Sequence, residues 1–331
     1  MNGSSKPRLY SDVNFDKSQE EMDLSSVHIT WGKQEIYEIL RKLGRGKYSD
    51  VYEGLNMSTQ DKIVIKILKP IKRSKILREI KTMRTLESYP NIPKLFDIIK
   101  DNNTKTAALI MEHCKSQDMI SLFSKLDEND IKFYLYEILK TLDFAHSKGI
   151  MHRDIKPSNI LINHQKKSLK IIDWGLADFY LPDTPYNVKV ASRYYKAPEL
   201  LVNYQYYDYS VDMWSFGVIF AGVIFKKNPF FHGHDNYDQL VKIVRVLGTE
   251  NFFEYIEKYD ISLDERYEDL KMHYNPKAWA KMVTDEMKFA SDEALNLLNK
   301  ILVFDHGERL LPSEAMQHQY FDSVRENKEK I

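Results

Sequence analysis

Residues 150–162 read IMHRDIKPSNILI, and this stretch decides the fold. Asp154 and Asn159 flank a proline, which predicts a loop here rather than a helix. An aspartate can accept a proton from a hydroxyl group, and an asparagine can hold a magnesium ion. Lys156 adds a cation that can neutralise phosphate charge. An ordinary polar turn is the alternative, but the whole string is far more specific than a turn requires.

A second aspartate, Asp173, follows directly after this stretch and the hairpin expected over residues 160–172. Carboxylate and amide oxygens are hard ligands that suit magnesium. The sequence therefore predicts Asn159 and Asp173 as metal ligands. The alternative for Asp173 is a charged residue that only ends a strand. Trp174 comes next, and its indole N–H could hold one position of this segment. A larger core aromatic is the other interpretation of Trp174.

Upstream, residues 37–110 have the alternation of strands, with a glycine-containing turn over residues 44–51. Glycines allow backbone amides to approach phosphate oxygens closely. A second strand follows the turn, which argues against a dinucleotide-binding fold, because that fold needs a helix there. An ordinary hairpin turn is the alternative interpretation.

Lys66 lies in the apolar run IVIKIL. A period of two places it on one face with Val64, while Ile65 and Ile67 occupy the other face. A lysine in such a strand needs an anionic partner, and Glu79 is a candidate, since it lies in a charged helix expected near residues 74–85. Alternatively, Lys66 protects an edge strand from pairing with another chain, or it forms only a weak surface ion pair with Glu79.

Composition limits the kind of protein. The chain has 331 residues, and its 48 Lys and Arg balance its 48 Asp and Glu. No global charge favours nucleic acid or membrane surfaces, so neither is expected as a partner. Cys114 is the single cysteine, which suits a reducing compartment. No signal peptide is recognisable, and the longest apolar run, 214–225, predicts a buried helix. We expect a soluble intracellular protein.

The order of these motifs resembles that of the eukaryotic protein kinases: glycine loop, strand lysine, helix glutamate, H-R-D-x-x-x-x-N, D-x-G and A-P-E. The chain also closely resembles the casein kinase II family of catalytic alpha subunits. That similarity rests on D-W-G at 173–175 and on two long strings, Tyr186–Ser210 and Pro229–Glu250. The sequence departs from that family at Met111, where the family has a bulky Phe, and at Ser74, which interrupts a basic run.

The resemblance implies an α+β, two-lobed protein kinase fold with a small β-rich N-lobe, one main helix in that lobe, and a larger helical C-lobe. It predicts an arm over residues 1–34 that packs on the kinase core, a kinase domain over 35–325 and a frayed C-terminus over 326–331. Within the domain, the expected bounds are about 35–112 for the N-lobe, about 112–118 for the hinge and about 119–325 for the C-lobe.

The resemblance also implies ATP and Mg²⁺ as cofactors, with GTP use left open. It assigns catalytic roles to Lys66, Glu79, Asp154 and Lys156, and metal binding to Asn159 and Asp173. The residues expected to hold the nucleotide are Leu43, Gly44, Arg45, Gly46, Lys47, Tyr48, Ser49, Val51, Val64, Lys66, Met111, Glu112, Cys114, Leu161, Ile172 and Asp173.

The implied activity is phosphorylation of Ser or Thr followed by acidic residues, by a constitutively active enzyme of the cytoplasm and nucleus. The cations expected to bind such acidic protein substrates are Lys72, Arg73, Lys75, Lys189, Arg193 and Lys196. A solvated basic face is the alternative. A dimeric regulatory beta subunit is the expected partner, on an exposed apolar sheet face that includes Ile39, Tyr52, Ile65, Ile67 and Ile99.

Two other functions compete with this interpretation. A pseudokinase would lack the lysine, the catalytic aspartate or the metal ligands, and all of these are present. A proline-directed kinase would not need the cations Lys189, Arg193 and Lys196.

Overall fold

The computed structural model describes residues 6–15 and 17–328. The chain divides into two compact units, which are described separately. The strand unit comprises residues 17–117 and 161–177, and the helical unit comprises residues 1–16, 118–160 and 178–331. Within the described part of the chain, no helix is both long and apolar enough to cross a membrane.

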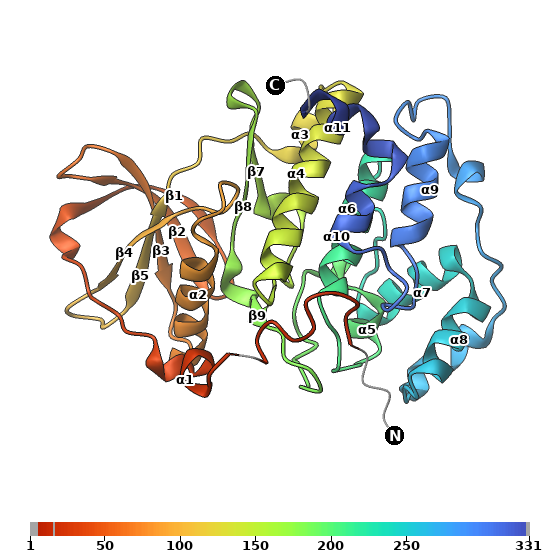
Figure 1. Ribbon diagram of the computed structural model, residues 1–331, viewed down its shortest axis with the longest axis horizontal. Coiled ribbons are helices and arrows are strands. Elements are labelled where there is room, and N and C mark those ends of the chain that lie inside the picture. Colours follow the sequence, from red (N-terminus) through yellow and green to blue (C-terminus); the bar gives the residue numbers. More distant parts are fainter. Residues whose placement is uncertain (1–5, 16, 329–331) are drawn as a thin grey trace. The chain divides into compact units, whose positions relative to one another are not determined.

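The strand unit is built on one antiparallel sheet with the order β1-β2-β3-β5-β4 (Figure 1). Its strands are β1 (Tyr37–Arg45), β2 (Ser49–Asn56), β3 (Lys62–Leu68), β4 (Leu95–Lys100) and β5 (Ala107–Glu112). Helix α1 (Gln19–Met22) precedes the sheet, and α2 (Arg73–Leu86) connects β3 to β4. The predicted strands, turn and charged helix are therefore confirmed, and β3 lies at the centre of the sheet.

The alternation along β3 sends its side chains to two cores. Ile63 and Ile65 pack on one face with Ile99 and Ile110. Leu68 packs on the other face, in a cluster that includes side chains of α2 and β5. The predicted faces of the strand are thus confirmed.

The expected exposure of the apolar sheet face is wrong for two residues. Ile65 and Ile99 are only 3% and 6% exposed, because the partly buried Tyr37, Tyr52 and Ile67 pack against their cluster. Ile39 remains open to solvent at 49%.

The last part of the strand unit is the short hairpin predicted over residues 160–172. Strands β7 (Ile160–Asn163) and β8 (Ser168–Ile171) form it. Lys167 closes the turn in the left-handed region, at φ 45°. The hairpin delivers Asp173 to the end of β8.

The helical unit contains most of the helices (Figure 1). They are α3 (Met119–Phe123), α4 (Glu128–Ser147), α5 (Pro198–Leu201), α6 (Ser210–Ile224), α7 (Asn236–Leu247), α8 (Thr249–Lys258), α9 (Asp292–Ile301), α10 (Pro312–Met316) and α11 (Asp322–Lys328). Two short strands, β6 (Ile150–Met151) and β9 (Asp178–Phe179), pair within it. Helix α6 is almost entirely buried, as its apolar run predicts.

Local signals explain why α4 begins and ends where it does. Asp127 caps its first turn by accepting a hydrogen bond from the Asp130 amide at 2.8 Å. Gly149 follows its C-terminus at φ 74°, a left-handed conformation that glycine adopts without strain. The chain then enters β6 and the loop that carries Asp154.

Both ends of the chain make defined contacts in the helical unit. The buried Asn14 donates from Nδ2 to the carbonyl oxygens of Gly149 at 2.7 Å and Tyr180 at 2.9 Å. Arg8 pairs with Glu314 at 2.5 Å. At the other end, α11 continues to Lys328, and the frayed C-terminus expected over residues 326–331 stays a prediction. Residues 329–331 lie outside the described part.

Candidate active site

Lys66 lies at the centre of a buried charge cluster in the strand unit. Its Nζ is 2.6 Å from Glu79 Oε1 and 2.7 Å from Asp173 Oδ1. The predicted partnership with Glu79 is confirmed, and both side chains are buried, so this is not a weak surface pair. Edge protection is excluded as well, because β3 is flanked by β2 and β5.

The electrostatics of this cluster favour a permanently charged lysine. Burial alone would lower the pKa of Lys66, but the carboxylates of Glu79 and Asp173 outweigh it and raise that pKa above its ordinary value. Gly175 makes the approach possible. A Cβ at this position would lie 3.2 Å from Glu79 Oε2 and 3.4 Å from Lys66 Nζ, which leaves little room for any side chain.

The backbone at Asp173 is held in an uncommon conformation. Its φ is 62° and its ψ is 68°, the left-handed region that costs a non-glycine residue roughly 1–3 kcal/mol. Such strain is typical of functional sites. The next side chain, Trp174, is buried and donates from Nε1 to the Ile171 carbonyl oxygen at 3.0 Å. Both proposed aspects of Trp174, the fixed indole and the core aromatic, are therefore present together.

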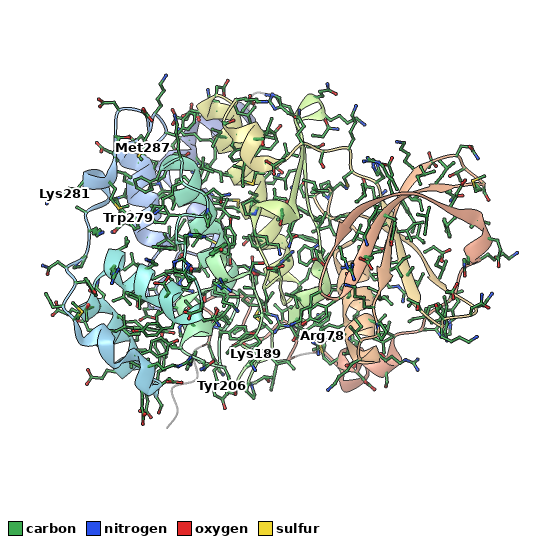
Figure 2. The ribbon with its side chains drawn as sticks, turned by 180° about the vertical axis from the view of Figure 1, so that it is seen from behind. Arg78, Lys189, Tyr206, Trp279, Lys281 and Met287 are labelled. Carbon is green, nitrogen blue, oxygen red and sulfur yellow. The ribbon has the colours of Figure 1, made fainter. Side chains whose placement is uncertain are left out.

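Replacing Trp174 by phenylalanine tests this indole bond. The Ile171 carbonyl would lose its donor in a buried place, and we expect the free energy of unfolding to fall by about 1–3 kcal/mol. Denaturant unfolding measures this loss. Trp279→Phe is the matched control, at a residue labelled in Figure 2. The Trp279 indole donates to the Asn299 side chain at 3.3 Å, a weaker contact with an amide that can turn elsewhere. Equal losses in the two variants would contradict a special role for the Trp174 bond.

The other predicted nucleotide residues of the strand unit lie on its turn, strands and hairpin. The turn between β1 and β2 is closed by a bond from the Gly46 amide to the Ser49 carbonyl oxygen at 2.8 Å. Lys69 also donates to the Gly46 carbonyl, at 2.5 Å. The residues of this set with partly exposed side chains are Val51, Val64, Met111, Glu112, Cys114, Leu161 and Ile172, whereas Leu43 is exposed. Apolar side chains with open faces could contact a planar base.

Asp154 is the focus of a hydrogen-bonded loop in the helical unit. Its Oδ1 accepts from the amide and the hydroxyl of Ser192, each at 2.9 Å. Lys156 Nζ lies 2.8 Å from its Oδ2. Asn159 Nδ2 donates to the Asp154 carbonyl oxygen at 2.9 Å. Asp154, Lys156 and Asn159 are thus brought together as the sequence predicts.

The loop is also held from behind by Asp212 on α6. The two carboxylate oxygens of Asp212 accept from the amides of His152 and Arg153 at 2.8 Å each. Burial alone would raise the pKa of Asp212, but the donors from His146 and His152 hold it below the usual range. Arg153 adopts φ 65° and pairs with Asp178 at 2.9 Å. A second strained residue therefore flanks the loop.

A family model described as Protein kinase domain matches residues 37–321, which is most of the chain. This chain belongs to the protein kinase family. Members of this family transfer a phosphoryl group from ATP to proteins and use divalent metal ions. The two-lobed fold class expected from the sequence is confirmed by this match and by the sheet and helices described above.

The donors present in the kinase fit a hard cation. Asp173 is 47% exposed at its side chain, and Asn159 uses its amide nitrogen for Asp154, which leaves its amide oxygen as the atom able to bind a metal. Among the described residues, no group of three or more His, Cys, Asp or Glu could hold a metal ion. A site with few protein ligands, all of them oxygen atoms, is typical of magnesium. The remaining ligands of magnesium are usually waters and substrate phosphates.

The cations expected to bind acidic substrates differ in their surroundings. Lys72 and Arg73 are exposed at the start of α2, and Lys75 is partly buried with its Nζ 4.6 Å from the centre of the Tyr48 ring. Lys189 is exposed on the segment after β9 (Figure 2). Arg193 is exposed and donates to the His234 carbonyl oxygen at 2.5 Å.

Lys196 corrects the expectation of a surface cation. It is buried, and its Nζ donates to the Val190 carbonyl oxygen. Burial lowers the pKa of Lys196 to about 8, with a smaller opposing effect of Asp154. The amino group of Lys196 thus binds a backbone carbonyl oxygen within its own segment and is not displayed at the surface.

The lowered pKa of Lys196 predicts a pH dependence of stability. Between about pH 8 and pH 10.5 the unfolded chain holds a proton on Lys196 that the folded chain has released, so stability rises with pH across this window. Relative to Lys196→Met, we expect the wild-type protein to gain on the order of 2 kcal/mol there. Thermal unfolding of both proteins from pH 7 to 10.5 measures the difference. Parallel curves would mean that Lys196 does not titrate as inferred.

Sequence reasoning missed two participants. Ser192 is one of several hydroxyl residues before A-P-E in the sequence, and in the structure it binds the carboxylate of Asp154. Asp212 lies near the start of α6, and in the structure it anchors the loop backbone. Their signals, a serine in the segment before A-P-E and an acid just before the apolar run of α6, carry meaning only once their distance to the loop is known.

Proposed function

We propose that this kinase is a serine/threonine kinase of the casein kinase II catalytic type. It would transfer the γ-phosphoryl group of ATP to hydroxyls that are followed by acidic residues. The observation that carries the proposal is the Asp154 carboxylate, which is bonded to both Ser192 and Lys156. The long strings at 186–210 and 229–250 support the subfamily, as does the D-W-G triplet at 173–175.

The roles follow from the chemistry of phosphoryl transfer, which depends on positioning and on charge neutralisation. Asp154 orients the substrate hydroxyl and accepts its proton. Lys156, beside it, stabilises charge on the transferred group. Lys66, fixed by Glu79, contacts the phosphates of the nucleotide. Asn159 and Asp173 would hold Mg²⁺, which neutralises phosphate charge when bound.

Acidic specificity is assigned to the exposed cations. Lys189 and Arg193 lie on either side of Ser192 in the segment after β9, and Lys72 and Arg73 are exposed on the strand unit. Charge pairing with carboxylates after the target residue would favour acidic substrates and weaken at high salt. In this proposal the backbone near Cys114 binds the edge of the purine. GTP could therefore replace ATP as the phosphoryl donor.

A peptide panel tests the proposal. Purified protein would receive labelled ATP, Mg²⁺ and one of three peptides: Ser followed by Asp and Glu, Ser-Pro, or Tyr followed by Asp and Glu. We expect salt-sensitive transfer to the acidic serine peptide alone. Preferred transfer to the Ser-Pro peptide would support a proline-directed kinase, and transfer to tyrosine would remove the serine/threonine assignment. ATP binding without transfer to any peptide would point to a pseudokinase.

Constitutive activity is proposed from the contacts of the N-terminal arm. Asn14 bonds Tyr180 at the start of the segment that leads to Ser192, and Tyr209 donates to the Tyr10 carbonyl oxygen at 2.9 Å. These bonds need no phosphorylation. Removing residues 1–16 should therefore lower kcat several-fold, whereas phosphatase treatment of the full chain should leave kcat unchanged. Full activity of the truncated protein would contradict this mechanism.

A dimeric regulatory beta subunit is proposed for the sheet face that carries Ile39. The available patch is smaller than the sequence predicts, since Ile65 and Ile99 are buried, but Ile39 and the partly exposed Tyr52 and Ile67 remain. Co-sedimentation with a recombinant beta subunit, lost in Ile39→Glu, is the expected result. Unchanged binding by Ile39→Glu would show that the beta subunit contacts a different surface.

A further inference from the structure

The strand unit has a pocket that lies apart from the residues assigned to the nucleotide, and among the residues assigned above to acidic substrates only Arg73 lines it. Its volume is 390 Å³, and it is lined by the β3–α2 connection, the first turns of α2, the β4–β5 turn and the segment before β1. Its apolar floor includes the buried Leu68, Leu77 and Ala107. A pocket with such a floor can accept one bulky apolar side chain.

Trp31 forms one wall of this pocket and is 45% exposed. The indole is not loosely attached, because the next amide, Gly32 N, donates to the Ile98 carbonyl oxygen at 2.9 Å and Gly32 bridges Ile99 on β4. An exposed aromatic on a fixed backbone costs little ordering entropy on binding, and Trp is enriched among residues that dominate interfaces. The pocket is therefore prepared for an apolar anchor.

The rim of the pocket is uniformly positive. Lys69, Arg73, Lys100 and Lys105 line it, and no carboxylate does. Their contacts are to neutral groups: Lys105 donates to the Asn102 carbonyl oxygen, and Lys100 lies over the Trp31 ring at 5.5 Å. None of the four forms an ion pair with a described residue. The nearby Asp101 is occupied by bonds from Thr104 and Gln34.

We propose that this pocket is a docking site for a linear acidic peptide segment of a partner protein. One aromatic or large aliphatic side chain of the segment enters beside Trp31, and flanking Asp or Glu residues pair with Lys100, Lys105 and Arg73. The chain as a whole carries no net charge, so this positive rim is a local feature rather than part of a general polyanion surface. A single aromatic also lacks the series of stacking side chains that single-stranded nucleic acid requires.

Direct binding to a synthetic probe tests the site. The probe is a short fluorescein-labelled peptide with a central Phe flanked by Glu, without Ser, Thr or Tyr, so it cannot be phosphorylated. Fluorescence anisotropy with the full chain should show saturable, salt-sensitive binding. The double variant Lys100→Glu/Lys105→Glu should weaken it by about tenfold or more, and so should Trp31→Ala. Lys166→Glu reverses an exposed charge of the same unit outside the pocket and should leave binding unchanged.

Three results would overturn the docking site. Equal affinity of the double variant and the wild-type protein would remove the cations from the interface. Equal affinity for a peptide with Ala in place of Phe would remove the anchor. Competition by a single-stranded oligonucleotide with the same dependence on Lys100 and Lys105 would reassign the pocket to nucleic acid. Phosphorylation of the acidic serine peptide, measured on the same variants, separates failure of this site from failure of the proposed kinase specificity.

Discussion

Replacing Asp154 by asparagine should reduce kcat for peptide phosphorylation by about 10²- to 10⁴-fold. The amide has nearly the same shape, so it can still accept hydrogen bonds from Ser192 through its oxygen. It cannot take up the proton of the substrate hydroxyl. Steady-state kinetics should therefore show the loss in kcat, with ATP affinity in a direct binding assay nearly unchanged.

The control for Asp154→Asn is Asp285→Asn, which removes the same charge at an exposed position of the helical unit. Its kcat should match that of the wild-type protein. If Asp154→Asn retained kcat within threefold of the wild type, Asp154 would not be the base, and another acceptor would have to be sought.

Replacing Arg309 by methionine should lower the free energy of unfolding by about 3–5 kcal/mol. Arg309 forms a two-pronged pair with Glu199, at 2.6 Å and 2.7 Å, and both side chains are completely buried. Methionine keeps much of the volume but leaves the Glu199 carboxylate without its partner. Most of the loss comes from this uncompensated charge rather than from missing packing. Denaturant unfolding at neutral pH measures it.

The double variant Glu199→Leu/Arg309→Met separates charge from packing. Because both charges are removed, we expect it to recover most of the stability lost by Arg309→Met. A double variant as unstable as the single one would attribute the loss to the carbonyl oxygens of Val303, Ser210 and Phe304, to which Arg309 also donates. Arg266→Met, which removes an exposed partner of Asp264, should cause no measurable loss.

The part of the site that could be predicted depends on regular elements. Lys66 follows from the alternation of β3, and Glu79 from the charged helix that succeeds it. In such elements the sequence position determines the face on which a side chain lies. The bond between Lys66 and Glu79 was therefore accessible from the sequence, as were the strands, α4 and α6.

The part that could not be predicted depends on irregular segments and tertiary packing. Ser192 lies 38 residues after Asp154, in a segment without periodicity, so their bond has no local signal. The same segment turns Lys196 inward to Val190, against the usual exposure of lysine. Ile65 is buried because aromatic neighbours from other strands cover it. Periodicity specifies a face of an element, but it does not specify what covers that face.

The contacts of Asn14 have a consequence for synthesis on the ribosome. Tyr180 follows Asn14 by 166 residues in the chain, and Glu314 follows Arg8 by 306. At about 5–20 residues per second, Asn14 waits roughly 8–30 s for Tyr180, and Arg8 waits roughly 15–60 s for Glu314. The contact of Asn14 can therefore form midway through translation of residues 8–314, whereas the ion pair of Arg8 can form only after the helices up to α9 have been translated.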